Sequence, residues 1–155
     1  MLSLLAFTGL AHADLRSEIN AARARVERAA KAKDVKGAEA AYRACVTSDF
    51  KYVQDGQTQD FKTFLGSFTA TIVMTDKVAS SSSRIITLKE SGSKATGKIE
   101  RKMTGTMKNP DKTIHSFDWT GVFTEEYRKV GGKWKTATMT AGKQKFLVDG
   151  KPVKM

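Results

Sequence analysis

The residues best placed to do chemistry are charged side chains on strand faces that are otherwise apolar. Arg101 is the first of them, and its neighbours at alternate positions are Gly97, Ile99 and Met103. A free charge on such a face would be costly. Arg101 therefore either anchors a ligand or extends its charge to solvent at the end of a curved sheet. Glu125, on a neighbouring strand, could pair with it, and a structural and a functional ion pair both stay open.

Histidine and cysteine are too scarce to predict metal or nucleophile chemistry. His115 is the only histidine after residue 13, and it alternates with Phe117 and Trp119. It is either a general base or, as we favour, a structural side chain with satisfied hydrogen bonds. Cys45, the only cysteine, lies among alanines of a predicted helix and is interpreted as an inert buried thiol. We predict no metal site and no cofactor, because neither zinc-ligand spacing nor a glycine-rich nucleotide-binding motif is present.

The elements that position these side chains are first helical and then extended. Asp14 is placed to cap a first helix, and Asp34 a second. Thr58 is a possible cap for a third. The expected apolar stripe of the first helix, with Arg16, Arg23 and Arg28 off it, is Leu15, Ile19, Ala22, Val26 and Ala29. The stripe of the third helix is Phe61, Phe64, Leu65, Phe68 and Ile72.

From about residue 77 the apolar period changes from 3.6 to 2. Besides a short strand at 50–53, the predicted strands are residues 84–89, 95–107, 113–129 and 134–141. Gly131 and Gly132 form the tip of the last long hairpin, since glycine supplies the positive φ angles of a tight turn. Three helices followed by strands in hairpin order predict an α+β fold, with the helices packed on one face of an antiparallel sheet.

The ends and the overall charge suggest where the chain works. Residues 1–13 are apolar, carry no formal charge and end in Ala11-His12-Ala13, a small-x-small pattern. We interpret them as a signal peptide, short or truncated, which predicts a periplasmic or secreted protein. No later stretch is apolar enough to span a membrane. The net charge is +11, but the cations are dispersed, which favours a solvated surface over a polyanion site and predicts no specific nucleic acid partner.

Residues 14–141 resemble the SnoaL-like branch of the nuclear transport factor 2-like superfamily. The resemblance rests on four segments in order: AKAKDVKGAEAAY, SDFKYVQDG, QDFKTFLGSF and FTEEYRKVGGKWKTATM. It implies a cystatin-like cone, in which a strongly curved sheet wraps around helices and encloses a pocket. Isomerases, dehydratases, cyclases and non-catalytic binding modules share this fold, so the fold leaves function open. Residues 142–155 are an extension that the resemblance does not explain, interpreted as an added strand or hairpin.

The resemblance also selects site residues. The side chains expected to line the pocket are Tyr52, Phe64, Arg101, Phe117, Trp119, Glu125 and Tyr127, and the weak catalytic candidates are Asp49, Arg101 and His115. Related chains often carry a histidine after the final tryptophan strand, whereas this one reads TATMTA. We therefore expect binding of a small apolar ligand. The alternatives are an isomerase or dehydratase, and a non-catalytic module that pairs with a second copy through the sheet or binds a polyanion.

Overall fold

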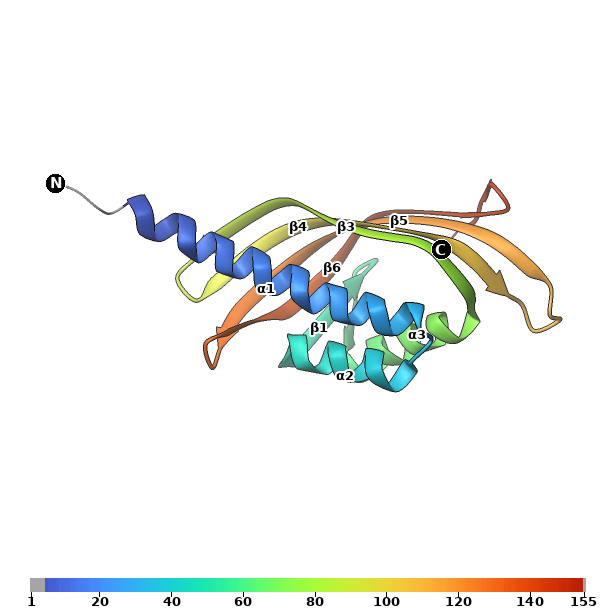
Figure 1. The fold of residues 1–155 in the computed structure, drawn as a ribbon, viewed down its shortest axis with the longest axis horizontal. Coiled ribbons are helices and arrows are strands. Elements are labelled where there is room, and N and C mark those ends of the chain that lie inside the picture. The colour runs from blue at the N-terminus through green and yellow to red at the C-terminus, as the bar shows by residue number, and fades with distance from the viewer. Residues whose placement is uncertain (1–4, 155) are drawn as a thin grey trace.

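The computed structural model describes residues 5–154, and the side chains of residues 14–154. Its three helices lie on one face of a curved sheet (Figure 1). They are α1 (Leu5–Lys31), α2 (Val35–Cys45) and α3 (Phe61–Met74). The Asp34 carboxylate caps α2 by accepting from the Gly37 amide at 2.9 Å, and Asp60 caps α3 by accepting from the Thr63 amide at 2.8 Å. Side-chain caps at these two aspartates therefore fix where α2 and α3 begin.

The N-terminal predictions fare differently. Residues 1–4 of the predicted signal peptide lie outside the described residues, and the backbone of residues 5–13 is the first part of α1. Asp14 therefore lies inside α1, and the prediction that it caps this helix was wrong. The predicted Thr58 cap was also wrong, because residues 57–60 form a strand and the cap of the third helix is Asp60. The signal peptide itself stays a prediction.

The sheet has seven strands, and most of them are long. They are β1 (Val46–Gln54), β2 (Gln57–Asp60), β3 (Thr75–Ser91), β4 (Lys94–Lys108), β5 (Ile114–Val130), β6 (Lys133–Val148) and β7 (Lys151–Pro152). The strand order is β2-β1-β6-β5-β4-β3, and β7 pairs with β6. The α+β prediction is confirmed. One pairing departs from the expected antiparallel sheet, because β1 runs parallel to β6. No hairpin links these two strands, so short turns do not set their direction.

The strands extend further than their alternation suggested. β3 begins at Thr75, nine residues before the predicted start at residue 84, and the serine run at residues 80–83 is itself paired with β4. Residues 142–148, in the unexplained extension, continue β6, and a turn at Asp149 leads into β7. These long strands give the sheet the reach to cover all three helices (Figure 1).

β3 is one edge of the sheet, and its outline is irregular. The register with β4 shifts at three points, between Thr75 and Lys77, between Val78 and Ser80, and between Ile85 and Thr87. Bulges of this kind increase the local twist of a strand. The serine run lies between the first two shifts and the third. The edge is therefore twisted and carries small polar side chains.

The apolar core lies between the helices and the concave face of the sheet, in two clusters. One cluster joins α2, α3 and β1 to the middle of the sheet and contains Tyr42, Phe50, Phe64, Phe123 and Met139. The other joins the first half of α1 to the hairpin ends and contains Leu15, Ile19, Ala95, Tyr127 and Trp134. Phe123, Tyr127 and Trp134 are all buried.

No helix in residues 5–154 is both long enough and apolar enough to cross a membrane. The predicted pairing of a second copy through the sheet stays a prediction.

Candidate functional site

A cavity of about 490 Å³ lies between the helices and the concave face of the sheet. All three helices and strands β1 to β6 contribute to its wall. Most of the lining is apolar, and its aromatic rings are Tyr42, Tyr52, Phe64, Phe68, Phe117, Trp119, Phe123, Tyr127, Trp134 and Phe146. The volume lies within the range that small-molecule sites commonly have, and mostly apolar walls with few polar groups are typical of such sites.

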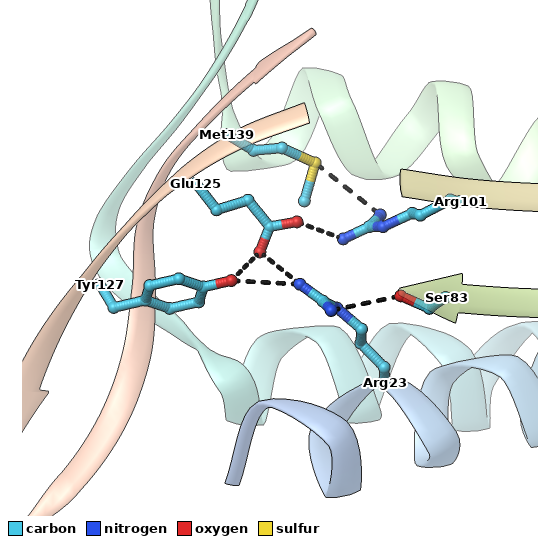
Figure 2. Close-up of polar contacts among 6 residues, drawn as sticks. All are labelled: Arg23, Ser83, Arg101, Glu125, Tyr127 and Met139. Carbon is cyan, nitrogen blue, oxygen red and sulfur yellow. Dashed lines mark hydrogen bonds and ion pairs between the residues drawn. The ribbon is translucent and has the colours of Figure 1, made fainter. Parts of the chain in front are cut away.

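A buried ion-pair cluster forms the polar part of the wall (Figure 2). Arg101 on β4 donates from Nη2 to Glu125 Oε1 at 2.5 Å. Arg23 on α1 donates from Nη2 to Glu125 Oε2 and to the Tyr127 hydroxyl, both at 3.1 Å. Tyr127 in turn donates to Glu125 Oε2 at 2.6 Å, and Ser83 accepts from Arg23 Nη1 at 3.2 Å. One carboxylate thus holds two guanidiniums and one phenol.

Glycines lie opposite both charged residues that the sheet contributes to this cluster. Arg101 is opposite Gly121 on β5, and Glu125 is opposite Gly97 on β4. A Cβ on Gly121 would come within 2.7 Å of the Trp119 ring, and one on Gly97 within 3.3 Å of the Tyr127 ring. Each charged side chain is therefore faced across the strands by a residue with no side chain, and the rings beside those glycines fill the space.

Burial and charge together set the protonation of the cluster. The side chain of Glu125 is only 2 % exposed, and those of Arg23 and Arg101 are 10 % and 20 % exposed. Burial by itself would raise the pKa of Glu125, but the two guanidiniums and the Tyr127 hydroxyl outweigh burial, and that pKa lies below its usual value. Burial raises the pKa of Tyr127, and the neighbouring Glu125 carboxylate raises it further. The cluster therefore holds an ionised Glu125 and a protonated Tyr127.

Two further titratable groups on the wall stay protonated. Burial raises the pKa of Tyr42, although the Arg101 charge opposes this. Burial likewise raises the pKa of Cys45 to about 11, and the thiol lies 3.3 Å from the Tyr42 carbonyl oxygen, to which it donates. A thiol with this pKa is not a nucleophile at neutral pH. This agrees with the interpretation of Cys45 as inert.

The structure places all seven predicted pocket residues on the wall of the cavity, while their role in binding stays a prediction. Of the catalytic candidates, only Arg101 lines it. Asp49 has a 63 % exposed side chain that pairs with Arg128. His115 pairs with Asp149 at the far end of β5. These three residues are therefore not brought together in one site.

Arg23 is the participant that we missed. We placed it off the apolar stripe of α1, but its side chain faces the cavity. It stands four residues after Ile19 and three before Val26, both of which are buried. These are the spacings at which helical residues share a face. An arginine at such a position is a signal for a buried ionic partner, and it was available in the sequence.

Metal ligands do not gather in the part of the chain that the structure describes. No group of three or more histidine, cysteine, aspartate or glutamate side chains there could hold an ion. What the arrangement can do is surround an apolar molecule and present cationic and hydroxyl donors at one place on the wall.

Comparison with solved structures now identifies the architecture. The chain is similar to a hexachlorocyclohexane dehydrochlorinase (LinA) type 2, with a TM-score of 0.64 and 13 % identity over 90 % of this chain and 88 % of that one. It is also similar to an NTF2-like protein of unknown function from Shewanella oneidensis, with a TM-score of 0.57 and 15 % identity over 83 % of this chain and 98 % of that one.

The chain has the NTF2-like fold. A third similar structure, from Nostoc punctiforme, is described as having a cystatin-like fold; the TM-score is 0.55 and the identity 16 %, over 81 % of this chain and 88 % of that one. The predicted resemblance to the nuclear transport factor 2-like superfamily is thus confirmed in its fold. No protein-family model matches the sequence, and no curated protein matches it. The NTF2-like fold alone does not select a reaction.

Proposed function

We propose that this protein binds a small, mostly apolar ligand in the cavity between its helices and its sheet. The observation that supports this is the cavity itself, of about 490 Å³, with aromatic walls and one polar cluster. A core that served only stability would be packed closely, because empty volume in a core is destabilising. The cavity is lined by residues from both ends of the chain, and a ligand there would contact the helices and the sheet together.

A binding measurement with an uncharged probe tests this proposal. N-phenyl-1-naphthylamine is apolar and fluoresces more strongly when it leaves water. We expect saturable fluorescence on titration into the wild-type protein. Ala22→Trp, which places an indole in the cavity, should remove most of that signal. The matched control is Ala21→Trp, on the exposed side of the same helix. Absence of saturable binding by the wild type, or equal binding by the two variants, would contradict the proposal.

The geometry gives less support to an isomerase or dehydratase. Such a site needs a carboxylate or histidine whose basicity is free for the substrate. The carboxylate deepest in the cavity wall, Glu125, is held by two guanidiniums, and its pKa is lowered by them despite burial. One structural neighbour is a dehydrochlorinase, but with 13 % identity the similarity to it extends to the fold and not to the reaction. We therefore assign no reaction to the cavity.

We further propose that residues 1–13 direct export and that the mature chain begins at Asp14. In support, these residues are apolar, carry no formal charge and end in a small-x-small pattern. A fusion of residues 1–20 to leaderless alkaline phosphatase, which is active only outside the bacterial cytoplasm, should be active and should lose residues 1–13. An inactive fusion that keeps residues 1–13 would contradict export.

A further inference from the structure

The ion-pair cluster carries more positive charge than it neutralises. Two guanidiniums share the single carboxylate of Glu125, so Arg23 and Arg101 leave one positive charge over in a part of the wall that is shielded from water. The other acidic side chains on the wall are Glu18 and Glu27, both on α1. Glu18 accepts from the Trp134 amide at 2.8 Å. Neither makes an ion pair with Arg23 or Arg101.

The same two arginines also carry hydrogen-bond donors that the protein does not use. The Nε atoms of Arg23 and Arg101 are buried and have no partner among the residues that the structure describes. Arg101 donates to the Glu125 carboxylate and also interacts with the Tyr42 hydroxyl, while its Nη1 contacts the Met139 sulfur at 4.0 Å. Buried donors are nearly always satisfied in native proteins, so an exception calls for an explanation. An anion bound in the cavity beside Arg101 would balance the surplus charge.

The surroundings of Arg101 suit the head of an amphiphile. Its side chain lines the cavity and is 20 % exposed there, whereas Arg23 is nine-tenths buried and is engaged by Glu125, Tyr127 and Ser83. The Tyr42 ring lines the cavity beside Arg101, and its raised pKa keeps the hydroxyl a donor. From this point the wall continues into aromatic rings. A ligand with one charged end and an apolar body would satisfy both parts of the wall.

We propose that the ligand is a monocarboxylate with an apolar body, and that its carboxylate binds Arg101 on the side of the guanidinium that faces the cavity. This inference rests on the proposed function, because it concerns the same cavity. Arginine suits the task, since its planar fork matches the geometry of a carboxylate. Arg23 keeps Glu125 ionised and so holds Arg101 in place, which makes Arg23 a positioning residue.

A pair of ligands that differ only in charge tests the inference. 2-Naphthoate and 2-naphthamide share their ring system, and only the first is an anion at neutral pH. Each is used to displace N-phenyl-1-naphthylamine from the wild-type protein. We expect the carboxylate to bind at least about tenfold more tightly, as a charge-assisted hydrogen bond at a shielded site provides. Sodium acetate, which has no apolar body, should displace the probe weakly or not at all.

Three variants locate the effect. Arg101→Met should bring the affinity of the carboxylate down to that of the amide, so that the preference for the anion disappears. Lys98→Met removes the same charge from an exposed position on the same strand and should keep the preference. Glu125→Gln removes the competing anion, so the preference should increase. This opposite shift is readable even if Arg101→Met does not fold.

The outcomes separate the two proposals. If neither naphthalene compound displaces the probe and the probe itself does not bind, the cavity proposal falls and this inference falls with it. If the probe binds and the amide binds as tightly as the carboxylate, the cavity proposal stands and the anion inference is overturned. A preference that survives Arg101→Met in a folded protein would also overturn it.

Discussion

Strand β5 carries two carboxylate-binding clusters that use similar groups in opposite surroundings. Near its C-terminal end, Glu125 is held by two arginines and a tyrosine under the helices. Near its start, His115 lies 2.7 Å from the Asp149 carboxylate, which also accepts from the Ser116 amide at 2.9 Å. Asp149 is 53 % exposed, whereas Glu125 is 2 % exposed. Judged only by the hydrogen-bond partners of their carboxylates, the two clusters would count as equally important for stability.

Their energetic roles differ because water is present at one and not at the other. If Asp149 is lost, water and the counterions of the solvent replace the contacts of His115 and Ser116. If Glu125 is lost, two guanidiniums stay buried without a counter-charge. The free-energy cost of those unpaired charges is far larger than the net stabilisation that the ion pairs gave. Of the two carboxylates, Glu125 is therefore the one whose loss destabilises the fold more.

The largest effect is expected from Glu125→Ala. Because Arg23 and Arg101 would lose their shared acceptor, the free energy of unfolding should fall by about 3–5 kcal/mol. Urea denaturation followed by tryptophan fluorescence measures it. Glu126→Ala, one position along on the exposed face of β5, is the control and should change stability little. Equal losses in the two variants would show that the Glu125 cluster matters no more than an exposed charge.

Stability measured as a function of pH tests whether the charge of Glu125 is what stabilises the fold. The pKa of Glu125 is lowered in the folded protein, since its two arginines and Tyr127 outweigh burial. Its stabilising contribution is therefore fully present above its unfolded pKa of about 4.3 and is lost as pH falls through the lower, folded value. The loss caused by Glu125→Gln should be greatest at neutral pH and should shrink in acid. Urea midpoints between about pH 3 and 7 would show this. A penalty that is constant with pH would contradict the lowered pKa.

The smallest effect is expected from Asp149→Asn. Asparagine tolerates the positive φ of 48° at this position and keeps one acceptor for Ser116, so the turn survives while the charge is lost. The pKa of Asp149 is lowered, chiefly by its hydrogen bond from His115. Because the group is exposed, the urea midpoint should move less than for Glu125→Gln. A larger shift than that of Glu125→Gln would reverse our ranking of the two clusters.

Sequence reasoning reached one half of the buried cluster and missed the other. The strand period of two placed Arg101 and Glu125 on inward faces, and their pairing across β4 and β5 is confirmed. On a helix the border of an apolar stripe is less sharp, since neighbours are 100° apart rather than on opposite sides. Arg23 stands at that border and was taken for a solvated residue. The long-range geometry of α1 and β5 was needed to bring Arg23 to Glu125.

The fold was predictable where connections are short and less so elsewhere. Hairpins follow from turn residues such as Gly131 and Gly132, and all the predicted long strands are present. The parallel pairing of β1 with β6 joins segments about eighty residues apart, and no local signal specifies it. The cavity depends on sheet curvature and on register shifts, which alternation does not encode. The sequence thus assigned pocket residues to the inward faces of strands, but it could not predict the volume of the cavity that they line.

The serine run on β3 has a consequence for how the protein behaves at high concentration. A seventeen-residue edge strand is long enough to template the strand of another molecule, which is a common route to aggregation. Register shifts twist this edge, and small hydroxyl side chains deny it an apolar strip. Replacing Ser80, Ser81 and Ser82 with valine would raise the strand propensity of this segment. It would also give the edge an exposed apolar strip that favours aggregation. Resistance to aggregation through this edge thus depends on serines, which have poor strand propensity.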